Sequence, residues 1–170
     1  ADGKALALSL APDIEADSAA LAPVFFADLR LLDADGREID RNFYWLPVAD
    51  DAYEWVPTPD NLPRFRPADL SALSGLPPVA LEAPPFEARD EGGTTTIVQE
   101  LRNPTAAVAF FVEALLLDEA TGLPVLPVLW DDNDVSLLPG ETRTLEARVA
   151  TKSVAGRSLG VKVSGWNVVP

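Results

Sequence analysis

TTTIVQELRNPTAAVAFFVEALLL, residues 94–117, decides the fold class of this 170-residue chain. It holds two runs rich in β-branched, aromatic and aliphatic residues, Thr94 to Arg102 and Ala109 to Leu117, which the turn residues Asn103 and Pro104 separate. Alternation of polar and apolar residues with a period of two recurs along the chain, as it does in half-buried strands. Helical spacing does not persist anywhere beyond about two turns. The sequence therefore predicts an all-β protein.

Outward from this stretch, short strands follow one another at regular intervals to the C-terminus. The predicted strands are 86–90, 94–102, 109–117, 125–130, 135–138, 142–150 and 159–168. Turn residues such as Gly92-Gly93 and Pro139-Gly140 separate them. Seven short strands in roughly ninety residues are typical of an immunoglobulin-like β-sandwich. We therefore expect a complete sandwich over 85–170.

Fewer strands are predicted ahead of this sandwich. Residues 4–10, 23–32 and 37–46 alternate like strands, and the last two flank the turn sequence DADG, residues 33–36, so they predict a hairpin. Three strands make only part of a sheet packing, so residues 1–58 are predicted to be the later strands of a second sandwich. Frequent prolines predict a linker over 59–84, with a helical turn at 66–74 that starts at Pro67.

Composition excludes several classes of partner and of chemistry. The chain has 27 acidic and 13 basic residues and a net charge of −14, and its basic residues do not cluster. Such a chain repels nucleic acid and anionic membranes, so we expect neither as a partner. Cys, His and Met are absent. Sites built on thiolate or imidazole are thereby excluded, together with Ser-His-Asp catalysis, and we predict no metal site and no cofactor.

Three segments of the chain resemble the C-terminal part of a known family. They are NFYWL at 42–46, VLWDDN at 128–133 followed by LLPGE at 137–141, and VSGWNV at 163–168. They resemble glycoside hydrolase family 2 enzymes of the exo-β-D-glucosaminidase and mannosylglycoprotein endo-β-mannosidase type. In that family a catalytic (β/α)8 barrel precedes two further immunoglobulin-like domains. The resemblance implies that this chain holds the last of these domains and part of the one before it.

The same resemblance implies which functions the chain itself lacks. Family 2 enzymes place their acid/base glutamate in an Asn-Glu dipeptide, and no asparagine of this chain is followed by glutamate. We therefore predict no catalytic residue, and a non-catalytic accessory region of a retaining glycosidase that acts on β-linked glycans. The expected partner is the remainder of such an enzyme or a second copy of this chain. Periplasmic or extracellular localisation is implied by the family alone.

An alternative function is a free-standing carbohydrate-binding sandwich. Exposed aromatic rings beside carboxylates hold sugars well, because the ring covers the apolar face of the pyranose while the acids accept its hydroxyls. The candidate contact residues are Trp130, Asp131, Asp132, Asn133, Tyr44 and Trp55. The competing hypothesis for the residues at 131–134 is a loop that caps its own backbone. Phe43, Trp45, Phe110, Phe111 and Trp166 lie inside strand patterns and are predicted to be core residues.

Overall fold

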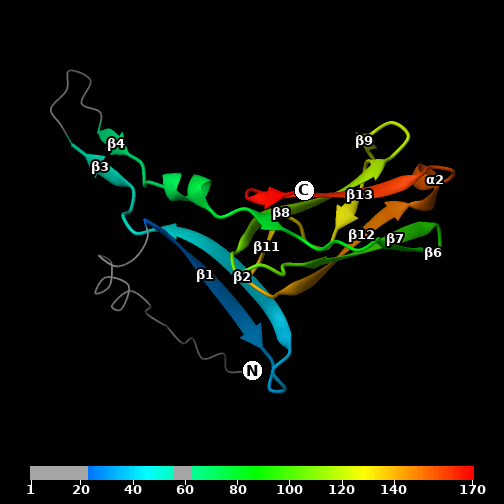
Figure 1. Ribbon diagram of the computed structural model, residues 1–170, viewed down its shortest axis with the longest axis horizontal. Helices are drawn as coiled ribbons and strands as arrows, with labels where there is room; N and C mark the ends of the chain where they lie inside the picture. Colours follow the sequence, from blue (N-terminus) through cyan, green and yellow to red (C-terminus); the bar gives the residue numbers. More distant parts are fainter. Residues whose placement is uncertain (1–22, 56–62) are drawn as a thin grey trace. The chain divides into compact units, whose positions relative to one another are not determined.

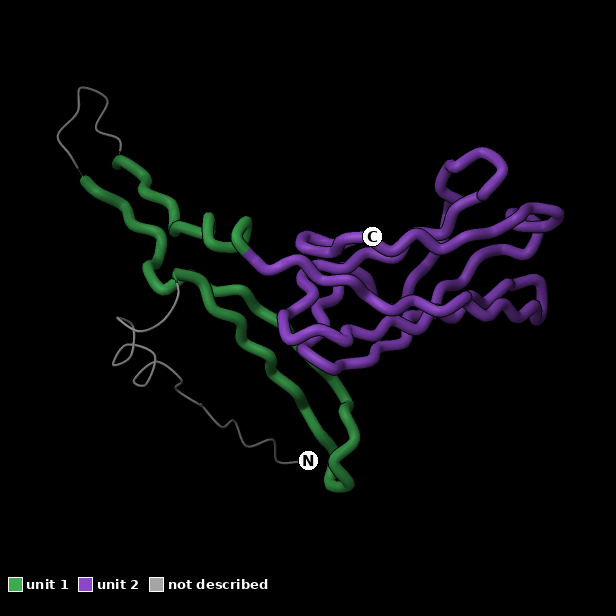
Figure 2. The backbone as a smooth tube through the Cα atoms, in the orientation of Figure 1, with its two compact units in different colours: residues 1–75 green, residues 76–170 purple. Residues whose placement is uncertain are grey.

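Strands make up nearly all of the regular structure. The computed structural model describes residues 23–55 and 63–170, so the predicted strand at 4–10 lies outside the described residues. The chain divides into two compact units, 1–75 and 76–170 (Figure 2). The described helices are a 3-10 turn, η1 (Ser71–Gly75), and one α-helical turn, α2 (Thr151–Val154), and none of them is long and apolar enough to cross a membrane. The prediction of an all-β fold is confirmed.

The second unit is a sandwich of two sheets (Figure 1). One sheet has the order β10-β12-β7-β6 and the other the order β11-β8-β13, with β9 added beside β8. The strands are β6 (Glu87–Glu91), β7 (Thr94–Arg102), β8 (Ala109–Asp118), β9 (Leu123–Pro124), β10 (Leu129–Trp130), β11 (Val135–Leu137), β12 (Thr142–Ala150) and β13 (Leu159–Ser164). Every pairing within these sheets is antiparallel.

The alternation of polar and apolar residues along the strands determines which side chains form the core of the sandwich. β7 and β12 have the predicted bounds and pair along their full length, from Thr94 opposite Ala150 to Arg102 opposite Thr142. Their alternate side chains are buried and pack against β8 and β11. The buried apolar residues of this unit are Val79, Ile97, Leu101, Ala109, Phe110, Val112, Ala114, Leu116, Val125, Val135, Leu137, Leu145, Ala147, Val149 and Val154.

The predicted strand at 125–130 is wrong as a single element. β9 pairs with β8 in one sheet, whereas β10 pairs with β12 in the other, so the chain changes sheets between Pro124 and Leu129. Pro124 and Pro127 lack the amide hydrogen that a continuous ladder needs, which explains the break. Val125 still donates its amide to the carbonyl of Leu116 over 2.9 Å.

Two short strands close one end of the sandwich. β5 (Val79–Ala80) pairs in parallel with β14 (Val168–Val169), and Val79 is fully buried in the core. β5 lies within 59–84, which the sequence predicts as a linker. The helical turn in that segment begins at Ser71, not at Pro67, because the Asp69 carboxylate accepts the Ser71 amide over 2.9 Å and caps the turn there.

The first unit contains the predicted hairpin. β1 (Val24–Leu32) and β2 (Glu38–Pro47) are antiparallel, and Asp33 closes the turn by accepting the amides of Asp35 and Arg37. Within the described residues these two strands pair only with each other. Large apolar side chains remain exposed on the hairpin: Leu29, Leu31, Leu32, Ile39, Tyr44, Trp45 and Leu46.

Three of the predicted core aromatics are exposed: Trp45 on the hairpin, at 38%, and Phe111 and Trp166 on the sandwich. Phe110 is buried as predicted, but Phe111 is 38% exposed because its positive φ of 55° and a register shift opposite β11 turn it outward. The prediction for Trp166 is wrong: its indole is 58% exposed and meets the Phe110 ring edge-on at 6.3 Å. The side chain of the next residue, Asn167, is buried in its place.

Candidate functional site

The side chains of the acidic loop after β10, residues 131–134, form hydrogen bonds and an ion pair with neighbouring strands of the sandwich. The Asn133 side chain accepts the Ala114 amide over 2.8 Å and donates to the Ala114 carbonyl over 3.1 Å. The Asp131 carboxylate accepts the amides of Asp132 and Glu146, each over 2.8 Å, and Asp132 forms an ion pair with Arg143. The loop thus uses the polar groups proposed for sugar contact to attach itself to β8 and β12.

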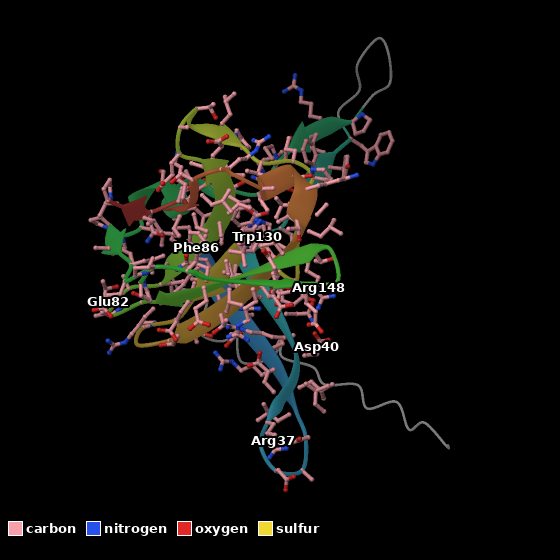
Figure 3. All side chains as sticks on the ribbon, turned by 90° about the vertical axis from the view of Figure 1, so that its right-hand side faces the viewer. Arg37, Asp40, Glu82, Phe86, Trp130 and Arg148 are labelled. Atoms are coloured by element: carbon pink, nitrogen blue, oxygen red, sulfur yellow. The ribbon has the colours of Figure 1, made fainter. Side chains whose placement is uncertain are left out.

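Trp130 is a packing residue of the sandwich (Figure 3). It is half-buried and contacts both halves of the core, the one around Leu101 and Leu145 and the one around Ile97 and Leu116. A ring held in this way between two groups of buried side chains presents little of its face to a ligand. Trp130 and the acidic loop that follows it are therefore neighbours in the structure, and the contacts that they make are contacts with the rest of the sandwich.

The other two aromatic candidates lie in the first unit. Tyr44 is 45% exposed on β2, opposite Ala27 in the hairpin register. Trp55 directly follows β3 (Ala52–Glu54), which pairs with β4 (Arg64–Arg66), and it is 72% exposed. Of the three aromatic residues among the predicted contacts, Trp55 is the most exposed.

Two carboxyl groups of the described residues, those of Asp28 and Asp69, have a pKa below its ordinary value, which does not suit a general acid. Burial works to raise the pKa of Asp28, but hydrogen bonds from Arg30 and Arg41, at 2.7 and 2.5 Å, hold it below its ordinary value. The pKa of Asp69 is also lowered, chiefly by its hydrogen bonds with Ser71. A glycosidase acid needs the opposite shift, because it must still carry its proton at the pH of the reaction.

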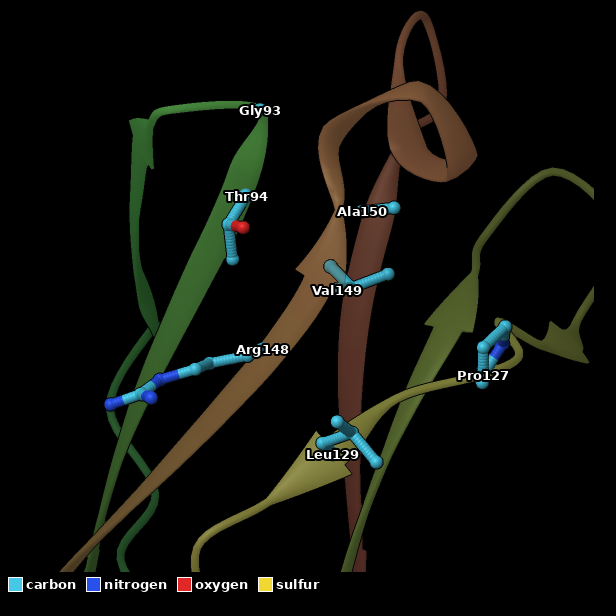
Figure 4. Close-up of a pocket in the computed structure, with 7 residues that line it drawn as sticks. All are labelled: Gly93, Thr94, Pro127, Leu129, Arg148, Val149 and Ala150. Carbon is cyan, nitrogen blue, oxygen red and sulfur yellow. The ribbon is translucent and has the colours of Figure 1, made fainter.

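A shallow groove on the sandwich, of about 320 Å³, lies beside the edge strand β10 (Figure 4). Gly93, Thr94, Pro127, Leu129, Arg148, Val149 and Ala150 line it. Arg148 is its one ionisable residue, and the guanidinium points away from Pro127 and Leu129 toward an ion pair with Glu146 at 3.1 Å. Retaining hydrolysis requires two carboxylates roughly 5 Å apart. This groove has none.

Nowhere in 23–55 and 63–170 do three or more carboxylates gather as a cation would require.

Sequence reasoning missed two buried asparagines that organise the sandwich. The Asn103 side chain donates to the carbonyls of Ala107, Leu137 and Leu138, at 2.7, 3.0 and 3.2 Å, and accepts from Thr105. Asn167 donates to the carbonyls of two segments far apart in sequence, at Pro77 and Val108. Asn103 precedes a proline, which signals a turn, but nothing in the local pattern shows that its side chain is buried.

Comparisons with known proteins agree on one family. The family profile described as "Exo-beta-D-glucosaminidase Ig-fold domain" matches residues 61–168. Exo-β-D-glucosaminidases from Amycolatopsis orientalis and Streptomyces avermitilis are 39% and 37% identical over 150 residues, or 86% of this chain. The crystal structure of the Amycolatopsis orientalis exo-chitosanase CsxA matches 87% of this chain with a TM-score of 0.76 and 38% identity. This chain spans 14% and 16% of the two curated relatives and 18% of the crystallised chain.

Proposed function

Because the chain belongs to the family of exo-β-D-glucosaminidase Ig-fold domains, we propose that it is a non-catalytic accessory region of a larger glycoside hydrolase of family 2. The observation that carries this proposal is how much of each protein the alignments cover. The alignments span most of this chain but 14% to 18% of relatives that are named as exo-β-D-glucosaminidases or exo-chitosanase. A catalytic barrel elsewhere in that protein would bind the β-linked glucosamine substrate and cleave its glycosidic bond. The whole enzyme would act outside the cytoplasm.

The hairpin supports a docking role for the first unit. A two-stranded sheet is marginal by itself in water, and β1 and β2 expose many large apolar side chains. Asp28 links Arg30 and Arg41 on one face, while Leu29 and Leu31 stand on the other. The remainder of the longer enzyme, or a second copy of this chain, would cover the apolar residues and complete the sheet.

A free-standing carbohydrate-binding sandwich centred on Trp130 is less well supported. That function needs an accessible ring and unengaged polar groups, whereas Trp130 packs against the core and Asn133 is bound to the backbone of β8. The loop after β10 is better explained as a structural element that connects β8 and β12 through hydrogen bonds.

A chimera tests the accessory role. We would replace the matching segment of the Amycolatopsis orientalis exo-β-D-glucosaminidase with this chain and compare it with an enzyme that lacks the segment. The chimera is expected to fold and hydrolyse an aryl β-D-glucosaminide, whereas the shortened enzyme is expected to lose thermal stability. Replacing Leu31 of the hairpin by serine should lower the melting temperature of the chimera, because less apolar area is buried at the docking surface, and should leave turnover unchanged.

The matched control for the chimera is Leu123→Ser, since Leu123 is 63% exposed on β9, compared with 58% for Leu31 on β1. An equal loss of stability in both variants would argue against docking through the hairpin. A shortened enzyme as stable and active as the intact one would contradict the accessory role.

A further inference from the structure

The two sheets of the sandwich differ in the residues on their outer faces. In the sheet β10-β12-β7-β6, the side chains that alternate with the buried ones are mostly threonine or charged. They are Glu87, Arg89, Glu91, Thr94, Thr96, Val98, Glu100, Arg102, Leu129, Thr142, Thr144, Glu146, Arg148 and Ala150. Polar residues on the outer face of an antiparallel sheet are typical of a face that water covers.

The outer face of β8 and β13 is more apolar. Its residues alternate with core residues such as Ala114 and Val161. They are Phe111, Glu113, Leu115 and Leu117 on β8 and Gly160, Lys162 and Ser164 on β13, and Trp166 follows. The ionisable groups among them, Glu113 and Lys162, have opposite charges, so the face is neutral although the chain carries −14. Aromatic residues without excess charge are typical of the centre of a protein–protein interface.

The backbone of Phe111 is strained in a way that turns its ring outward. Its φ of 55° lies in the left-handed region, which a bulky side chain disfavours. Phe110 and Phe111 together lie opposite Ser136 in the register of β8 and β11, and such a bulge redirects a side chain. Asparagine or glycine would adopt this backbone with less strain. A phenylalanine that is 38% exposed at this position therefore indicates that the outward ring has a function.

We propose that the outer face of β8 and β13, with Phe111 as its anchor, packs against the remainder of the same longer polypeptide. The alignments span 14% to 18% of the relatives, so most of such a protein lies outside this chain. A second copy is a poorer partner, because two chains with a net charge of −14 repel each other. The choice of partner rests on the proposed function, and the surface lies in the second unit.

Hydroxyl-radical footprinting of the isolated chain and of the chimera with the Amycolatopsis orientalis enzyme tests this surface. Oxidation of Phe111, Leu115 and Leu117 is expected to be slower in the chimera, because the enzyme covers their side chains there. Leu129 is the internal control, since it is 72% exposed on the outer face of the other sheet and should be oxidised equally in both proteins. Equal oxidation of the three β8 side chains in both proteins would overturn the proposal.

Phe111→Asn distinguishes docking from a purely structural role by the sign of its effect. Asparagine tolerates the left-handed backbone, so the melting temperature of the isolated chain is expected not to fall. In the chimera the substitution removes the anchor ring, and the melting temperature is expected to fall. Leu129→Asn is the matched control and should change neither protein. An equal fall in the isolated chain and in the chimera would mean that Phe111 stabilises the sandwich alone, which would overturn the proposal.

The remaining outcomes separate this inference from the function on which it rests. Light scattering shows whether the isolated chain dimerises, and a dimer that protects Phe111 and Leu115 would overturn the choice of partner. A chimera that hydrolyses an aryl β-D-glucosaminide while this face stays open would contradict the inference and leave the accessory role intact. A chimera that does not fold would contradict the accessory role, and the inference would fail with it.

Discussion

Replacing Asn103 by alanine is expected to lower the free energy of unfolding of the sandwich by about 3 kcal/mol, since a buried polar group that loses its partner costs about 1–3 kcal/mol. The side chain is fully buried and supplies hydrogen bonds to the carbonyls of Ala107, Leu137 and Leu138. Alanine removes these donors, and it also leaves the backbone amide of Thr105 without its acceptor. Denaturant unfolding followed by circular dichroism measures the loss.

The control for this prediction is Asn42→Ala, because Asn42 is exposed on β2 and the side-chain change is the same. Its effect should remain within about 0.5 kcal/mol, as at most surface positions. Equal effects of the two substitutions would mean that the buried amide network contributes nothing to the stability of the sandwich.

Gly165→Ala is expected to destabilise the sandwich by about 2 kcal/mol, within the range for an overpacked core. A Cβ at this position would lie 2.7 Å from Val168 Cγ2, 3.2 Å from the Phe110 carbonyl oxygen and 3.3 Å from Val112 Cα. Two of these three atoms belong to the backbone, so the neighbouring strand itself must move. We expect the parallel pairing of β14 with β5 to open first, which faster hydrogen exchange at the Val79 amide would report.

Gly160→Ala is the matched substitution in β13. Its Cβ would meet only the flexible Glu119 side chain, at 3.1 Å, and that side chain can move aside. A loss of stability at Gly160 as large as that at Gly165 would contradict the steric explanation.

Regular alternation is the part of the fold that sequence reasoning recovers. β7 and β12 were predicted with the bounds that they have, because each buries alternate side chains against a second sheet. The hairpin was predicted from its turn chemistry, which Asp33 provides through two backbone amides. These features depend on neighbours in sequence, and local patterns are enough to identify them.

Features that depend on distant contacts were not recovered. The run at 125–130 changes sheets, and only the pairing of β9 with β8 and of β10 with β12 shows it. Asn167 is buried because the carbonyls of Pro77 and Val108 need its amide, and its burial leaves Trp166 outside. Trp130 was chosen as a candidate sugar contact from its acidic neighbours in sequence, and its packing against both halves of the core depends on residues far away in sequence.

The same contrast holds for the candidate site. Trp55 was identified as exposed and aromatic from sequence, and the structure places it at the end of β3. The strand that pairs with β3 is β4, which places Phe65 opposite Tyr53, and the sequence predicted a linker there. A surface that needs two strands cannot be recognised when neither strand is predicted.

Hydrolysis of 4-nitrophenyl β-D-glucosaminide by the purified chain tests the central claim most directly, with the Amycolatopsis orientalis exo-chitosanase, which has been crystallised with this type of substrate, as the positive control. The chain has no Asn-Glu dipeptide. Among the described residues, no carboxylate lines the groove beside β10, and Glu54 is the one carboxylate that lines a second groove at β3 and β4. We therefore predict release of nitrophenol no faster than in buffer, across the whole pH range in which the chain is folded. Turnover that disappears when a carboxylate of this chain is replaced, as in Glu54→Gln, would contradict the account.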